Sequence, residues 1–159
     1  MTEANPFWEF SLALYSRPGI ADACLKLQDE HSVDVNLLLY CAWRCSVGAP
    51  LDAEGVSAVD AGIREWRAEV VQPLRTLRRK LKSVSGSDST RDLVKQAELD
   101  AERVQQLEMF KLDIPASAIV TAEKREPEMA PLAAFLRLPE EVFEEFCQAA
   151  ALGLRNRTD

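Results

Sequence analysis

The chain has 159 residues, of which 47% are hydrophobic and 28% charged, and this balance is typical of a folded globular protein. With 19 basic and 26 acidic residues the formal net charge is −7, which opposes general attraction to nucleic acid or to anionic lipid. No apolar run approaches the ~20 residues of a membrane helix. We therefore expect neither nucleic acid nor a membrane as a partner.

The first five residues lack the basic region that opens a secretory signal. The four cysteines, Cys24, Cys41, Cys45 and Cys147, lie within apolar runs, as reduced core thiols do in cytosolic proteins. We therefore expect a cytoplasmic protein with free thiols, and a disulfide is the less favoured alternative.

The first helix is predicted from residue 6 to about residue 16. Asn5 provides a side-chain cap, and Pro6 suits the first helical position because its missing N–H is not needed there. Trp8, Leu12 and Tyr15 recur at helical spacing and share one face.

Two further helices complete the predicted N-terminal part, residues 5–48. The second covers about residues 20–30 and has the period of a half-buried helix. The third, about residues 35–45, follows Asp34 as its cap and is apolar almost all round. Such a helix belongs at the centre of a helical domain, and a buried strand is the rival interpretation.

Residues 56–112 carry the clearest periodicity of the chain. Eight apolar residues spaced by three or four predict one long helix over residues 57–82, which Pro73 bends or interrupts: Val56, Val59, Ile63, Trp66, Val70, Leu74, Leu77 and Leu81. A second helix follows a polar insert and has its own stripe, made of Leu93, Ala97, Ala101, Val104, Leu107 and Phe110. Two facing stripes joined by a short polar loop predict a long antiparallel helical hairpin.

The last part, residues 113–154, is predicted to be a Pro-rich connector followed by a C-terminal helix that opens at Pro139. Helical periods in every long segment predict an all-α fold. The length predicts a single-domain helical bundle over residues 1–159.

No motif supports a catalytic, cofactor-binding or metal-binding role for any residue. Cys24, Cys41 and Cys45 could together bind a soft metal, but small buried residues are the simpler interpretation. His31 is interpreted as a surface residue at a helix end rather than as an acid or base. A pocket under the third helix is an open alternative, and its lining would be Trp8, Tyr15, Gln28, Asn36, Tyr40 and Trp43.

Seven basic residues against two acidic ones lie between residues 64 and 82. Arg75, Arg79 and Lys82 are spaced to share a face, which is a candidate surface for an anionic partner. The favoured alternative is structural: the basic residues complement the helix dipole and pair with the acidic helix that follows.

Mainly over residues 5–48, the chain has a pattern of residues that resembles a known family: Trp8, Leu14 and Tyr15, Gly19, residues 24–28, residues 34–39 and Trp43. The family that this pattern resembles is an uncharacterised proteobacterial family of short conserved hypothetical proteins, a domain of unknown function. The resemblance implies a bacterial, cytosolic, mainly helical protein. It supplies no catalytic residue and no cofactor.

The sequence favours a non-enzymatic interaction or regulatory protein whose partner is another protein or a second copy of the chain. The alternative is a small-molecule-binding or enzymatic helical protein with a pocket lined by Trp8, Tyr15, Tyr40 and Trp43. An exposed patch would support the first interpretation, and an enclosed cavity with convergent polar groups the second.

Overall fold

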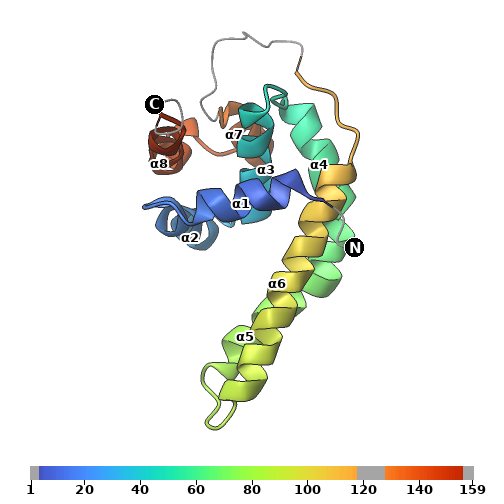
Figure 1. Ribbon diagram of the computed structural model, residues 1–159, viewed down its shortest axis with the longest axis vertical. Helices are drawn as coiled ribbons and strands as arrows, with labels where there is room; N and C mark the ends of the chain where they lie inside the picture. Colours follow the sequence, from blue (N-terminus) through green and yellow to red (C-terminus); the bar gives the residue numbers. More distant parts are fainter. Residues whose placement is uncertain (1–3, 118–127, 156–159) are drawn as a thin grey trace. The chain divides into compact units, whose positions relative to one another are not determined.

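The computed structural model describes residues 4–117 and 128–155, and its regular secondary structure is helical (Figure 1). These residues contain no strand, so the predicted all-α class is confirmed. None of the helices in these ranges combines the length and the apolar character needed to cross a bilayer. The chain divides into two compact units, residues 1–60 with 113–159 and residues 61–112. The organisation as one domain stays a prediction.

Helix α1 (Pro6–Tyr15) begins as predicted, because the Asn5 side chain accepts the backbone N–H of Trp8 at 3.1 Å. The face that Trp8, Leu12 and Tyr15 share is not the buried one, since Leu12 is 51% and Tyr15 46% exposed. The buried positions are instead Phe7, Ser11 and Leu14. Apolar side chains occur nearly all round this helix, so the helical period did not determine which face is buried.

Helix α2 (Ile20–His31) ends at Ser32, which adopts a left-handed conformation with φ +55°. The Asp34 side chain then caps α3 (Val35–Ser46) by accepting the backbone N–H of Leu37 at 3.2 Å. Helix α3 is buried along most of its length and contacts both α1 and α2 (Figure 1). The central position predicted for this helix is confirmed, and the strand interpretation is wrong.

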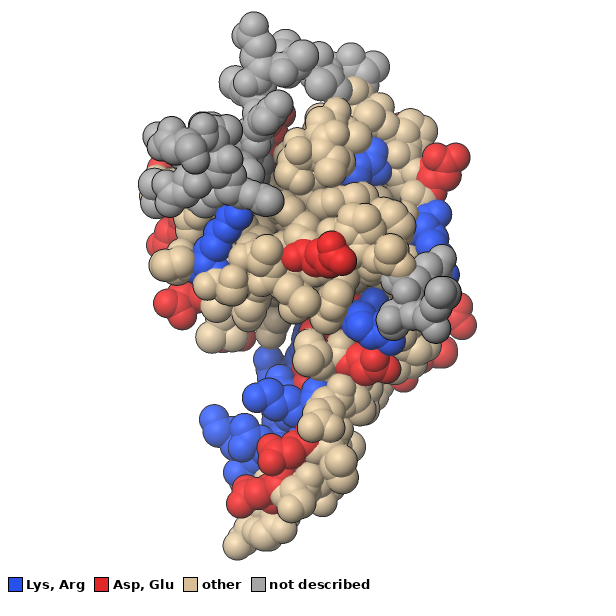
Figure 2. All heavy atoms as spheres, viewed as in Figure 1, with Lys and Arg blue, Asp and Glu red and all other residues tan. Residues whose placement is uncertain are grey.

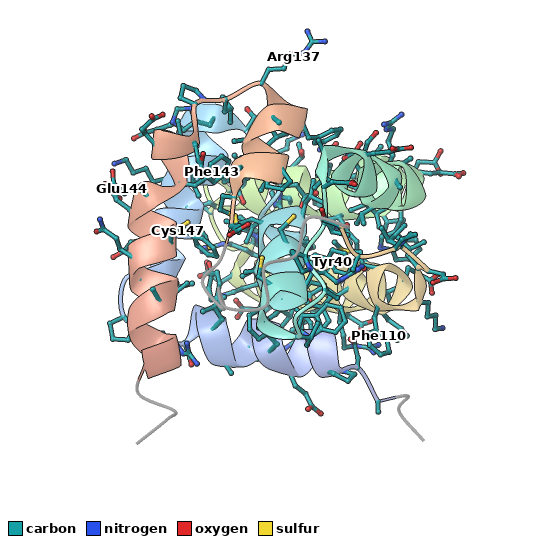
Figure 3. The ribbon with its side chains drawn as sticks, turned by 90° about the horizontal axis from the view of Figure 1, so that it is seen from above. Tyr40, Phe110, Arg137, Phe143, Glu144 and Cys147 are labelled. Atoms are coloured by element: carbon teal, nitrogen blue, oxygen red, sulfur yellow. The ribbon has the colours of Figure 1, made fainter. Side chains whose placement is uncertain are left out.

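The same unit contains α7 (Ala130–Leu136), the 3₁₀ helix η2 (Glu140–Phe143) and α8 (Glu144–Arg155). Helix α8 packs against α2, and Lys26 pairs with Glu145 at 2.8 Å. Phe143 is buried, whereas Arg137 points away from the helices and Glu144 lies on the outer side of α8 (Figure 3). The predicted C-terminal helix is confirmed, and residues 118–127 of the predicted connector lie outside the described residues.

The predicted long helix is divided into α4 (Ala53–Trp66), the π-helix η1 (Arg67–Val71) and α5 (Gln72–Leu81). It begins earlier than predicted, because Asp52 caps it by accepting the N–H of Gly55 at 2.8 Å. The interruption that was predicted at Pro73 is the π-helix η1, which lies in the turn before the proline. Proline lacks an N–H and clashes with the preceding turn, and a π-helical turn relieves this conflict.

In the second unit, α5 lies beside α6 (Asp88–Lys111), and the two run in opposite directions (Figure 1). Trp66 Nε1–H donates to the carbonyl of Ala101 at 2.9 Å, and Arg78 further along pairs with Glu98. We call α5 and α6 the helix pair.

The apolar stripe predicted on α6 is buried only in part: Ala101 is buried and Val104, Leu107 and Phe110 are half-buried, whereas Leu93 is 68% exposed and Ala97 is also exposed. The buried positions of α6 are Glu98, Ala101, Gln105, Gln106 and Met109. The Arg–Glu pairing between the two helices places Glu98 in the contact beside Ala101.

Candidate functional site

The aromatic residues of the predicted pocket are only partly brought together. Tyr40 and Trp43 of α3 contact Phe7 of α1, with ring centroids 5.2 Å apart for Phe7 and Tyr40 and 5.5 Å for Phe7 and Trp43. Tyr40 and Trp43 are 5.6 Å apart. These are the distances of rings that pack on one another, so the three residues fill the space between α1 and α3. Figure 3 shows Tyr40 in the interior of the bundle.

The other predicted pocket residues lie elsewhere or in different environments. Tyr15 is on the exposed face of α1, while Trp8 and Gln28 are half-buried and Asn36 is buried. Phe7, which is fully buried and contacts both Tyr40 and Trp43, was not predicted for this cluster.

Arg44 in α3 is a buried cation, 6% exposed, that was not predicted from the sequence. Its guanidinium donates from Nε to the carbonyl of Ala49 at 2.7 Å and from Nη2 to the carbonyl of Ile114 at 2.9 Å. Nη1 lies 3.3 Å from the hydroxyl oxygen of Tyr40, and the guanidinium carbon lies 5.8 Å from the centroid of that ring. Arg44 therefore connects α3 to two irregular segments. The one available signal was a lone arginine inside an apolar run.

Cys24, Cys41 and Cys45 are buried, and His31 is the last residue of α2. Burial raises the pKa of Cys24 to about 12, and the same cause raises the pKa of Cys41 to about 12. Burial also raises the pKa of Cys45, although the N–H of Glu128 at 3.5 Å opposes this shift. His31 lies at the end of α2, 3.9 Å from Glu30. Within the described ranges no three His, Cys, Asp or Glu side chains are grouped as metal ligands would be.

We expect Cys24 and Cys41 to resist thiol reagents at pH 8 in the native protein, because a pKa near 12 leaves only about one thiol in ten thousand ionised. A disulfide reagent with a chromogenic leaving group, followed by mass spectrometry, measures the reaction at each cysteine. Both thiols should react once denaturant is added. Fast labelling of either one in a protein with native circular dichroism would contradict this expectation.

The helix pair contains an ion-pair network that is partly buried. Arg75 donates from Nε to Glu98 at 3.1 Å and from Nη2 to Glu102 at 2.8 Å, and Arg78 pairs with Glu98. Burial alone would raise the pKa of Glu98, but the hydrogen bonds and charges of Arg78 and Arg75 lower it below its usual value. The predicted pairing of the basic helix with the acidic helix is confirmed for these two arginines.

Other cations of the helix pair remain exposed. Arg79, Lys82 and Lys95 form no ion pair within the described part of the chain. The ion pair between Arg75 and Glu98 fixes how the two antiparallel helices align. Arg79 lies one turn beyond Arg75, and Lys95 lies one turn before Glu98, so these two cations lie at a similar height along the helix pair and on the same side of it. We call Arg79, Lys82 and Lys95 the basic surface. Figure 2 shows Lys and Arg side chains gathered over α5.

The predicted face of Arg75, Arg79 and Lys82 is therefore divided. Arg75 turns toward the carboxylates of α6, while Arg79 and Lys82 face solvent. Lys95 comes from α6, which sequence spacing along one helix did not reveal.

Comparison with known proteins identifies a family. No curated protein and no solved structure matches the chain. The model of a family described as "Protein of unknown function (DUF2390)" matches residues 6–109, which include α1 to α5 and most of α6. The chain therefore belongs to the DUF2390 family.

Proposed function

We propose that the protein is a non-enzymatic helical interaction protein, which binds an acidic surface of a protein partner through Arg79, Lys82 and Lys95. One observation carries this proposal: these three cations of the helix pair and its connecting turn are exposed and have no acidic partner among the described residues. The neighbouring Arg75 and Arg78 are paired within the chain, so structural pairing accounts for them but not for the basic surface.

The charge distribution favours a protein partner over nucleic acid. Residues 61–112 carry eleven basic and eight acidic side chains, whereas the rest of the chain carries eight basic and eighteen acidic ones. A long polyanion would meet repulsion from this acidic remainder, while a compact acidic surface needs only the local positive field. We place this interaction in a bacterial cytoplasm, as the resemblance and the reduced, buried thiols suggest.

The proposal is tested by the fluorescence anisotropy of a labelled glutamate-rich peptide. We expect Arg79→Glu, Lys82→Glu and Lys95→Glu combined to weaken binding at least about tenfold, because each reversal replaces an attraction with a repulsion. The melting temperature should change little, since exposed charges contribute about 0–1 kcal/mol each.

A matched pair of single variants controls for net charge. Arg79→Glu and Lys80→Glu change the charge of α5 equally, and both positions are exposed. Arg79→Glu should weaken peptide binding more, because Lys80 lies outside the basic surface. Equal effects of the two variants, or tighter binding of a DNA duplex than of the peptide, would overturn the proposal.

A further inference from the structure

The 3₁₀ helix η2 and the first turn of α8 carry acidic side chains that the chain does not neutralise. The two elements begin with four glutamates, and all four are exposed. Glu145 pairs with Lys26 at 2.8 Å, whereas the other three form no ion pair within the described part of the chain. We call these three residues, Glu140, Glu141 and Glu144, the acidic surface.

The helix dipole favours acidic residues in a first turn, and Glu9 in α1 is a single residue placed in this way. The acidic surface holds three unpaired carboxylates within about one turn, and Glu144 lies on the outer side of α8 (Figure 3). Like charges at this spacing repel one another. An approaching group of cations would relieve that repulsion, so this surface suits a basic partner.

The acidic surface and the basic surface match in charge and in spacing. Each consists of three exposed charges that have no ion-pair partner among the described residues. Arg79 and Lys82 are three residues apart, and so are Glu141 and Glu144. Because residues at this spacing are neighbours on a helix surface, two salt bridges can form at once between the two surfaces.

We propose that the acidic partner of the basic surface is the acidic surface of a second copy of this chain. The inference rests on the proposed function, since it names the partner of that same surface. Residues 61–112 carry three more basic than acidic side chains, and the rest of the chain carries ten more acidic than basic ones. Opposite charges therefore guide the two surfaces together, while contact between two basic or two acidic surfaces is disfavoured. The contact joins two different surfaces of the chain, so it is heterologous.

Sedimentation velocity of the full chain over a range of concentrations tests this self-association. At about 0.01 M salt we expect an average mass that exceeds the chain mass and rises with concentration. The association should weaken as salt is raised to about 0.15 M, because the screening length falls from about 30 Å to about 8 Å.

Exchanging the charges provides the sharpest test. Arg79→Glu, Lys82→Glu and Lys95→Glu combined give a chain with two acidic surfaces, and Glu140→Lys, Glu141→Lys and Glu144→Lys combined give one with two basic surfaces. Each triple variant alone should self-associate at least about tenfold more weakly, since like charges then face each other. An equimolar mixture of the two should associate as the unaltered chain does. Circular dichroism confirms that both variants keep their helices.

Glu141→Lys and Glu9→Lys form the matched control. Both glutamates are exposed and lie in the first turn of a helix, and the two substitutions change the charge equally. Glu141→Lys should weaken the self-association about threefold or more, whereas Glu9→Lys should leave it unchanged because Glu9 lies outside the acidic surface. Equal effects would mean that net charge alone governs the association, which would contradict the proposal.

The proposal would also be overturned by a chain that stays monomeric at every concentration in low salt, or by a mixture of the two triple variants that does not associate. The peptide experiment separates this failure from that of the proposed function. A monomeric chain that binds the glutamate-rich peptide through the basic surface would keep the proposed function and assign the surface to a different acidic protein. A monomeric chain that does not bind the peptide would contradict both proposals.

Discussion

Replacing Arg44 with alanine is expected to lower the free energy of unfolding by about 3–5 kcal/mol. The guanidinium is buried and donates to the carbonyls of Ala49 and Ile114. Without it, both carbonyls lose a charged donor in a place that water reaches poorly, and the ring of Tyr40 loses its neighbour. Urea unfolding followed by circular dichroism at pH 7 measures the effect.

Arg44→Lys separates the charge from the geometry of the guanidinium. Lysine keeps the positive charge but cannot reach two carbonyls in different directions with a planar fork, so most of the destabilisation should remain. If Arg44→Lys were as stable as the unaltered protein, the two hydrogen bonds would not be what stabilises this region.

Replacing Glu98 with glutamine is expected to cost about 2–4 kcal/mol at pH 7. Glu98 is the buried carboxylate that Arg75 and Arg78 share, so the substitution leaves two partly buried guanidinium groups without their common partner. The same urea experiment measures the effect. Asp100→Asn is the matched control, because Asp100 is exposed on α6 and pairs only locally with Arg103, and it should cost less than about 1 kcal/mol.

The effect of Glu98→Gln should depend on pH. The pKa of Glu98 is lowered in the folded state, so its contribution to stability is complete above the unfolded value of about 4.3 and is lost as the pH falls through the folded pKa. The stability difference between the two proteins should therefore be largest near neutral pH and shrink in acid. A difference that stays constant from pH 7 to pH 2.5 would contradict the role of the ionised carboxylate.

The N-terminal helices could be predicted because local chemistry determines their ends. Asn5 and Asp34 cap α1 and α3 as their sequence positions indicate, and Pro73 disrupts the long helix through its missing N–H. These features depend on residues within one or two turns, and such interactions act in any tertiary context.

The buried faces were harder to predict, because they depend on contacts between distant residues. On α1 apolar residues surround the helix, so the choice between Leu12 and Leu14 is made by packing against α3. On α6 the ion pairs of Glu98 draw a charged residue into the contact and leave Leu93 exposed. A prediction from apolar periodicity assumes that leucine is buried in preference to glutamate. A glutamate whose charge is paired can be buried while a nearby leucine stays exposed.

The candidate sites were also predictable only as far as they depend on residues close together in the sequence. Spacing on one helix identified Arg79 and Lys82, but it grouped them with Arg75, whose carboxylate partners are more than twenty residues away. It also missed Lys95, which reaches the basic surface from the neighbouring helix. The role of Arg44 depends on a carbonyl seventy residues further along the chain.

Quantitative affinity capture from host cells tests the central claim most directly, namely that Arg79, Lys82 and Lys95 serve a partner whereas Arg75 and Arg78 serve the fold. Mass spectrometry after nuclease treatment compares three chains: the unaltered chain, the triple Arg79→Glu, Lys82→Glu and Lys95→Glu variant, and a Lys80→Glu control at an exposed position outside the basic surface. We expect an acidic protein to be recovered with the unaltered chain and the control but not with the triple variant, although all three melt alike. Recovery of the same proteins by all three chains, or loss of all recovery after nuclease treatment, would contradict the claim.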